Sequence, residues 1–350
     1  MSKDNENVPS DPFFTDGPAA EPIPRFTPDQ MITCESCLRS NPPTRLQCLY
    51  CGHALPASNV AVELQKPDMR PLESWEQGYN NILTTSTATN VSNAAVSSAA
   101  DLLKLDREVL ARLISTNHAV PMARTGTRDE ATLIQRKLAT FGFDTEIVAD
   151  VNLADVGTPF RVRAAEFSDG SLKLYERQGE RPVDLSFNQI LLFVVGRLTV
   201  QRVESREETV RGRENRVLEA NEFFNDETIF DFYTSERRPF RIMSKSFDFS
   251  CLGPNKGLLV KENTSRLLEV FRTHARDAVW DDSYNLLSRV LESVWPLQRS
   301  EHSAGWRRDR PGKLTKGNVT EISNEAQFQK YSSLCHLLTV RPPLESDEHS

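Results

Sequence analysis

The sequence predicts a multidomain α+β protein with a small metal-bound module near its N-terminus. Three observations support this prediction. Two close pairs of cysteines precede residue 52, helical and strand-like patterns alternate after about residue 101, and many short strand-like runs follow from about residue 156. At about 100–200 residues per domain, a chain of 350 residues has room for two or three folded units.

The composition excludes several classes of protein. Its 42 Lys and Arg against 49 Asp and Glu give a net charge of −7, without the basic excess of a nucleic-acid binder, so nucleic acid is not expected as a partner. The longest apolar run, residues 190–195, is far shorter than the roughly 20 residues that span a bilayer. The first residues also lack the apolar stretch of a secretory signal. We therefore expect a cytoplasmic protein.

Three polar segments are expected to lie outside the folded domains. Residues 1–30 are expected to form a disordered arm, residues 56–100, rich in Ser, Thr, Asn and Ala, a flexible linker, and residues 298–350 a polar tail. The tail contains a basic run, residues 307–316 beside Trp306, which we expect to be solvated. Contact of this run with anionic lipid or nucleic acid is the alternative.

Four of the six cysteines indicate a metal site in residues 31–55. Cys34, Cys37, Cys48 and Cys51 form a C-x2-C-x10-C-x2-C pattern. Zn²⁺ takes four ligands tetrahedrally and thiolates suit it, so each pair supplies half of the tetrahedron. With four protein ligands the ion has no open position, which predicts one structural Zn²⁺ and no catalytic one. The alternative is a pair of redox dithiols, or a chance pattern.

The residues around these cysteines carry a family resemblance. Asn41 and Gly52 extend the pattern to C-x2-C-x3-N-x6-C-x2-C followed by Gly, which resembles the zinc finger of the Ran-binding-protein type, and more broadly short bacterial zinc ribbons, over about residues 32–55. The chain has Ile32 where that family has Trp, and Leu38-Arg39 where its ubiquitin-binding members have Thr-Phe. The resemblance therefore implies the zinc site, while the family's RNA and ubiquitin ligands are not carried over. We expect Asn41 to bond the backbone of the turn and His53, so close to Cys51, to be an exposed loop residue.

Residues 101–153 predict a small α/β module. Apolar residues from Leu102 to Ile114 have helical spacing, and residues 119–124 and 144–149 are strand-like. Between these strands, Thr127 with Glu130 three residues later is typical of a helix start, and Gly142 of a helix end. This order looks like a split β-α-β (ferredoxin-like) or ribosomal-stalk-like module.

Residues 156–297 predict a strand-rich domain closed by helices. The Asp-Gly of residues 168–171 predicts a hairpin, and further strands are expected at 189–203, 228–234, 240–244 and 247–252. The charged run 204–219 is expected to be a solvated hairpin loop. Helical spacing begins at Leu258 and Leu259, and a second helix is expected at 284–294. Antiparallel strands closed by C-terminal helices resemble a pleckstrin-homology-like or GRAM-like β-barrel.

The sequence contains little that indicates catalysis. It has no nucleophile elbow, P-loop or HExxH motif. The stretch Gly253–Gly257 lacks the ending of a phosphate loop and is expected to be a turn before a helix. His118, His274 and Asp282 can be drawn as a triad, but scattered His and Asp residues are common in a chain of this length. Cys251 and Cys335 are expected to be small buried residues.

These observations lead to a functional hypothesis. We expect a non-enzymatic, zinc-binding adaptor or regulatory protein that recruits a protein partner through its zinc ribbon, with no small-molecule substrate. The alternative is peripheral binding to anionic membranes through the strand-rich domain and the basic tail.

Overall fold

The chain divides into two compact units, residues 1–66 and 67–350. The computed structural model describes residues 26–53, 55, 67, 69–73, 75–84, 91–116, 118–154, 157–168, 170–177, 179, 181–208, 216–235, 238–310 and 313–340. It describes only the backbone of residues 206–208, 216–219, 304, 306–310 and 313–316. Most of the arm expected at residues 1–30 lies outside the described residues.

The described part of the first unit is very small. It contains the 3-10 turn η1 (Pro28–Gln30) and one antiparallel pair of strands, β1 (Ile32–Thr33) and β2 (Ser40–Asn41). Its buried apolar cluster consists of Ile32, Cys34, Cys48 and Leu55 among the described residues. A core of this size cannot stabilise a fold alone.

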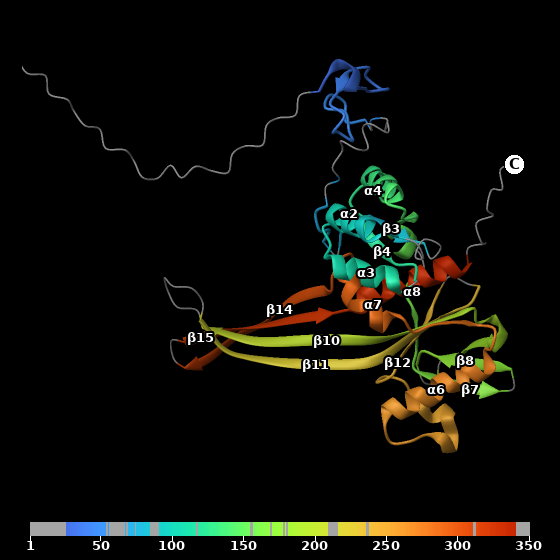
Figure 1. Cartoon of the computed structure of the whole chain (residues 1–350). Coiled ribbons are helices and arrows are strands. Elements are labelled where there is room, and N and C mark those ends of the chain that lie inside the picture. The colour runs from blue at the N-terminus through green and yellow to red at the C-terminus, as the bar shows by residue number, and fades with distance from the viewer. Residues whose placement is uncertain are drawn as a thin grey trace, which may run out of the picture. The chain divides into compact units, whose positions relative to one another are not determined.

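A curled sheet runs through the second unit (Figure 1). Its two long central strands, β10 (Leu192–Glu208) and β11 (Arg216–Tyr233), are antiparallel. The order across the sheet is β14-β15-β10-β11-β12-β6, and β13 pairs with the beginning of β10. The shorter strands are β6 (Phe160–Val162), β12 (Phe240–Met243), β13 (Val279–Asp281), β14 (Gln298–Arg310) and β15 (Lys313–Ser323).

Both faces of this sheet are covered where β10 begins. Leu192 and Val194 belong to one hydrophobic core, and Phe193 and Val195 to the other. Successive side chains of a strand point to opposite faces, so a strand buried on both sides is apolar at every position. This explains why residues 192–195 are all apolar.

The first core joins the sheet to two helices and to an α/β part. The helices are α7 (Tyr284–Leu291) and α8 (Glu325–Val340). The α/β part consists of β3 (Tyr79–Leu83), α2 (Asn93–Leu103), α3 (Arg107–Ser115), β4 (Pro121–Thr125), α4 (Arg128–Thr140), β5 (Thr145–Ala149) and α5 (Asp150–Ala154). Their side chains share one core, so the α/β part and the helices fold against each other.

Within the α/β part, β4, α4 and β5 form a β-α-β unit. Strand β3 lies between β4 and β5 and is antiparallel to both, so β4 and β5 are parallel. Helix α4 starts as expected, because the backbone N–H of Glu130 donates to the Thr127 hydroxyl at 3.3 Å, and Gly142 follows it with a φ of +86°. The expected linker is wrong where β3 and α2 form; residues 56–66 and 85–90 lie outside the described residues.

The second core covers the other face of the sheet. It packs a three-stranded antiparallel sheet and helix α6 (Val260–His274) against β10, β11 and β12. The strands of the small sheet are β7 (Ala164–Ser168), β8 (Ser171–Tyr175) and β9 (Val183–Ser186). Ser168 pairs with Ser171, which confirms the hairpin expected there.

Two expected segments differ locally. Residues 247–252, expected to be a strand, lead into the 3-10 segment η4 (Phe249–Asn255), because the Asp248 carboxylate accepts from the N–H of Ser250 at 3.0 Å and starts a turn. The charged run 204–219, expected to be a loop, is strand at both ends, and residues 209–215 lie outside the described residues. Leu258 and Leu259, assigned to a helix, precede α6.

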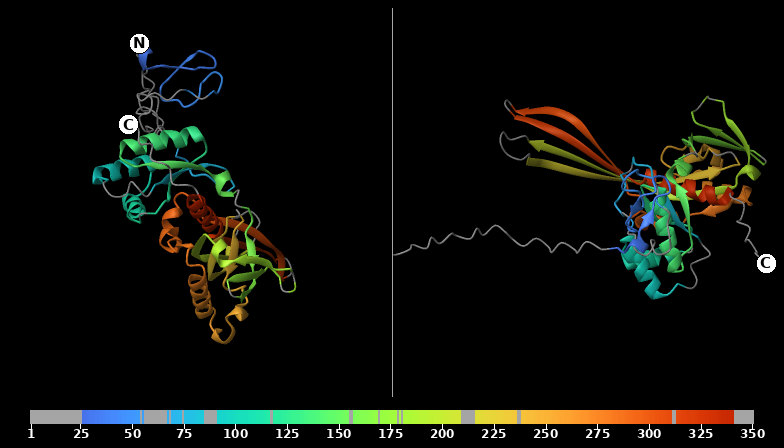
Figure 2. Two further views of the ribbon diagram at one scale, coloured as in Figure 1. Left: turned by 90° about the vertical axis from the view of Figure 1, so that its right-hand side faces the viewer. Right: turned by 90° about the horizontal axis from the view of Figure 1, so that it is seen from above.

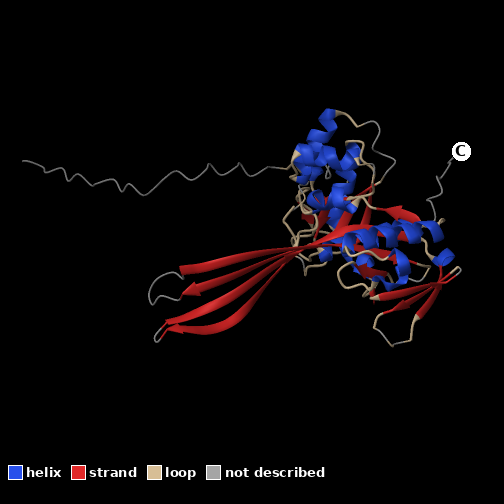
Figure 3. Cartoon of the chain, turned by 90° about the horizontal axis from the view of Figure 1, so that it is seen from below, coloured by secondary structure: helices blue, strands red, loops and turns tan. Residues whose placement is uncertain are grey.

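The expected polar tail is also wrong as a description of residues 298–340. This segment forms β14, β15 and α8, and the basic run 307–316 lies where β14 and β15 approach their connection. The far parts of β10, β11, β14 and β15 extend beyond the two cores as a four-stranded ribbon (Figures 2 and 3). Residues 220–226 are all exposed on it. Apart from Phe223 and Phe224, which are 53% and 76% exposed, the side chains of residues 220–226 are polar or small, so this part of the sequence resembles a loop.

Among the described residues, no helix is both long and apolar enough to span a lipid bilayer.

Candidate metal centre

The four cysteines expected to bind metal lie together. Their sulfur atoms are all within 4.8 Å of one another, with Cys34 Sγ 3.6 Å from Cys51 Sγ and Cys37 Sγ 3.5 Å from Cys48 Sγ. Sulfurs bound tetrahedrally at about 2.3 Å from one zinc ion are about 3.8 Å apart, whereas a disulfide brings them to about 2.05 Å. The arrangement therefore suits one metal ion and contains no disulfide among these residues.

The two cysteine pairs sit on equivalent turns. In the first, the N–H of Leu38 donates to the carbonyl of Cys34 at 2.8 Å; in the second, the N–H of Gly52 donates to the carbonyl of Cys48 at 3.0 Å. Leu38 and Gly52 hold the same position and both have positive φ, 58° and 73°. Glycine adopts this conformation readily, while for other residues it is unfavourable.

Asn41 links the two turns. Its side chain is fully buried, donates to the carbonyl of Arg39 at 2.8 Å and to Cys48 Sγ at 3.4 Å, and accepts from the N–H of Leu49 at 2.8 Å. This confirms the expected backbone-bonding role and adds a direct contact with one of the thiols. A side chain of this kind orients a metal ligand without binding the metal.

The thiols are arranged to share protons. Burial raises the pKa of Cys48, but the N–H groups of Tyr50 and Cys51, with the side chains of Cys37 and Asn41, lower it to about 6. The N–H of Arg39 lowers the pKa of Cys37, but burial and the neighbouring thiols raise it to about 12. A divalent cation replaces such shared protons when it binds thiolates.

The remaining sulfur and histidine candidates lie elsewhere or stay outside the cluster. His53 is exposed and is not part of the four-residue group. Cys251 is half-buried, and its burial together with the charge of Asp248 raises its pKa to about 11. Cys335 lies 3.7 Å from a carboxylate oxygen of Asp281, and burial raises its pKa. Both thiols are therefore protonated near neutral pH.

The surface beside the metal centre is apolar. Leu38, Leu49 and Tyr50, here called the knuckle surface, are 77%, 51% and 56% exposed. The guanidinium of Arg39 lies 4.8 Å above the Tyr50 ring. The sequence holds one signal for this surface, which the expectations above did not use: Leu38 stands at the position equivalent to Gly52.

The residues proposed as a triad do not form one. His118 Nε2 is 2.8 Å from the Ser283 hydroxyl, while His274 Nδ1 bonds the carbonyl of Val270 on its own helix and Asp282 is exposed. No carboxylate among the described residues hydrogen-bonds His118, so this serine–histidine contact lacks the third member of a triad.

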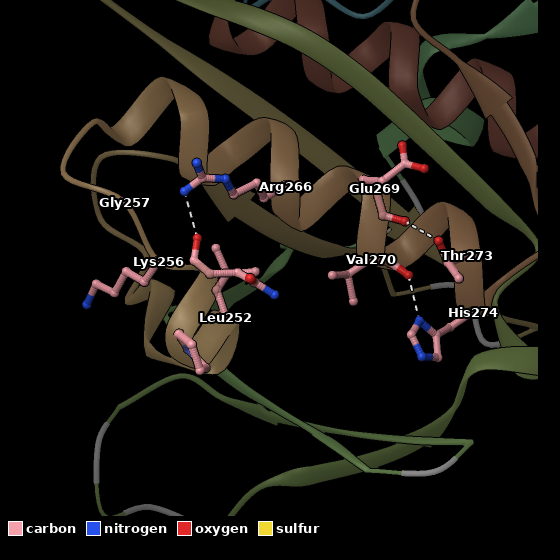
Figure 4. A pocket seen from close by; sticks show the side chains of 10 residues that line it. Leu252, Lys256, Gly257, Arg266, Glu269, Val270, Thr273 and His274 are labelled. Atoms are coloured by element: carbon pink, nitrogen blue, oxygen red, sulfur yellow. Dashed lines mark hydrogen bonds between the residues drawn. The ribbon is translucent and has the colours of Figure 1, made fainter.

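The Gly253–Gly257 turn borders a hollow of about 740 Å³ beside α6 (Figure 4). Lys256, Arg266 and His274 line it together with Glu269. Arg266 donates to the carbonyl of Asn255 at 2.6 Å, and Thr273 bonds the carbonyl of Glu269. These contacts hold Arg266 and Thr273 against backbone carbonyls of the loop and the helix.

Comparison with known proteins gives no relative for this chain: no family model, no curated protein and no solved structure matches it.

Proposed function

We propose that this protein is a non-enzymatic adaptor in which four cysteines hold one structural Zn²⁺ and the knuckle surface recruits a protein partner. The donor set supports zinc, since four thiolates in a closed tetrahedron are typical of structural zinc sites. An adaptor of this kind links the partner bound by the first unit to the second unit of the same chain.

The observation that carries the proposal is the conformation of Leu38. A leucine at φ +58° is destabilising by about 1–2 kcal/mol relative to glycine, and the equivalent position of the second turn is Gly52. Leu38 gains no burial in return, since it is exposed. A residue that is locally unfavourable and unburied points to a role in binding.

Replacing Leu38 by glycine provides a matched test. Leu38→Gly keeps the backbone conformation and all four cysteines, so it should retain one zinc per chain by atomic spectroscopy. In Leu38→Gly/Tyr50→Ser, removal of the apolar contacts should weaken binding of a partner cross-linked at the knuckle surface by about tenfold or more.

Two further variants complete this experiment. Cys34→Ser/Cys48→Ser should lose both zinc and partner, while Leu286→Ser, which alters an exposed leucine on α7, should lose neither. A partner that binds the Leu38→Gly/Tyr50→Ser chain with unchanged affinity contradicts the recruitment role. Absence of stoichiometric zinc from the wild-type protein contradicts the metal assignment.

For the second unit we propose a PH/GRAM-like barrel over about residues 160–278. Two three-stranded antiparallel meanders, β7-β8-β9 and β10-β11-β12, followed by α6 packed in the same core, support this proposal. We propose likewise that the β-α-β unit with its central β3 is a split β-α-β module of the ferredoxin-like kind.

A further inference from the structure

Three consecutive apolar residues project from the second unit at the start of α6. Leu258 is fully exposed, Leu259 is 60% exposed and Val260 is 44% exposed. We call residues 258–260 the apolar tip. Single exposed leucines are common on soluble proteins, but a continuous exposed run marks an interaction site.

The local sequence does not favour the helix start found there. Leu259 is the N-cap of α6, and its side chain makes no capping hydrogen bond. Ser, Thr, Asp and Asn are strongly preferred at this position because they satisfy free N–H groups of the first turn. The leucine therefore contributes neither to the cap nor to the core.

The turn that presents the tip is nevertheless fixed in place. Asn263 is buried, and its side chain accepts from the N–H of Gly257 at 2.7 Å and donates to the carbonyl of the same residue at 2.9 Å. Arg266 donates to the carbonyl of Asn255 (Figure 4). At Gly257 a Cβ atom would lie 2.7 Å from the Arg266 guanidinium, which would have to shift to admit a side chain. A buried asparagine thus holds an exposed apolar turn in a defined conformation.

Basic residues flank the tip. Residues 253–266 contain Lys256, Lys261 and Arg266 against Glu262, so their net charge is 3 − 1 = +2 in a chain of −7. Lys256 contacts Asp248 at 3.4 Å, and Arg266 contacts Glu262 at 3.7 Å. Lys261, next to the tip, forms no ion pair with any residue that the structure describes.

We propose that the apolar tip inserts into the surface of a lipid bilayer that contains anionic lipids, with Lys256 and Lys261 contacting the headgroups. The projecting leucines suit the hydrocarbon of the bilayer, and the lysines on either side of them suit its negatively charged headgroups. A protein partner would need a matching hollow for a fully exposed leucine, whereas a bilayer accommodates a projecting side chain without one. The charge reversal relative to the whole chain favours an anionic surface.

Vesicle flotation with the full-length, zinc-loaded protein tests this proposal. We expect flotation with vesicles of phosphatidylcholine and phosphatidylserine, weak flotation with phosphatidylcholine alone, and loss of binding as salt screens the charges. Leu258→Ser/Leu259→Ser should reduce partitioning about tenfold or more, because two leucine side chains no longer leave water. Lys256→Gln/Lys261→Gln should remove the preference for phosphatidylserine.

The matched control is Leu286→Ser, which changes an 82% exposed leucine on α7 and should float like wild type. The fluorescence of the tryptophan introduced in Leu258→Trp should be quenched by brominated acyl chains, and that of the tryptophan introduced in Leu286→Trp should not. No flotation of the wild type, or equal flotation of the tip and Leu286 variants with unchanged thermal unfolding, overturns the proposal. Cys34→Ser/Cys48→Ser should still float, which separates this inference from zinc-dependent recruitment.

Discussion

Asp150 shows how single polar residues hold the second unit together. Its carboxylate accepts from the N–H of Gly78 at 3.0 Å, from Asn80 at 3.0 Å, from Arg124 at 2.8 Å and from Lys330 at 3.3 Å. Trp295 donates to Asn80 at 2.9 Å and extends the cluster. These residues come from β3, β4, α8 and the segment after α7, so one buried carboxylate connects the α/β part to the C-terminal helix.

The same carboxylate predicts a pH dependence of stability. Burial raises the pKa of Asp150, but the Asn80 hydrogen bond and the charges of Lys330 and Arg124 outweigh burial and lower it. A pKa below the unfolded value of about 3.9 stabilises the fold above that pH, and this stabilisation is lost as pH falls through the folded pKa. The free energy of unfolding, measured with urea at pH values from about 7 down to about 3, should show this loss of stability.

Asp150→Asn should lower the free energy of unfolding at neutral pH by about 3–5 kcal/mol, because Arg124 remains buried without its partner charge. It should also flatten the dependence on pH. Asp282→Asn, an exposed carboxylate outside the cluster, should behave like wild type. An Asp150→Asn protein with the wild-type slope would show that other carboxylates dominate.

At the scale of elements, α8 is the part of the structure that was hardest to foresee. Its buried residues include Gln327, Ser332 and Ser333, so it lacks an apolar stripe. Gln327 donates to the carbonyl of Trp295 and accepts from the Tyr284 hydroxyl, both at 2.8 Å, and Ser332 donates to Asp231 at 2.8 Å. Buried polar groups with partners are tolerated in a core, and periodicity alone cannot reveal partners distant in sequence.

Helices α7 and α8 pack so closely on the sheet at Gly196 that no space is left for a side chain there. A Cβ atom at this position of β10 would lie 2.6 Å from the Phe328 ring and 2.8 Å from the Tyr284 ring. Gly196→Ala should therefore lower the free energy of unfolding by about 1–3 kcal/mol through overpacking.

Gly126→Ala is the control for this prediction. Its nearest neighbour would be a Leu72 methyl at 3.8 Å, an ordinary contact, so we expect a change within about 0.5 kcal/mol. Chemical denaturation of both variants gives the comparison. Equal stabilities would mean that α8 moves away from β10 without loss.

At the scale of the whole molecule, features that depend on neighbouring residues were predictable from the sequence, whereas the pairing of segments distant in the sequence was not. The cysteine pattern, the Thr127 cap and the hairpin at 168–171 each depend on a few neighbouring residues, and all three agree with the structure. The linker and tail predictions failed because β3 pairs with β4 and β5, and the β14–β15 hairpin pairs with β10, all of them distant in the sequence. The apolar tip could not be recognised either, because the exposure of a residue follows from the packing of everything around it.

The two units should also differ in what keeps them folded. The buried apolar cluster in the described part of the first unit has four residues, two of them cysteines, whereas the second unit has two extensive cores. We therefore expect the free energy of metal binding to supply the folding free energy of the first unit and to contribute nothing to the stability of the second. A strong chelator added to the full-length protein should collapse the amide signals of residues 32–53 in a proton–nitrogen NMR spectrum and leave those of the second unit in place. Calorimetry should show the same unfolding midpoint for the second unit with and without chelator, and re-addition of Zn²⁺ should restore the lost signals. A shift of that midpoint on chelation would show instead that the metal centre stabilises the whole chain.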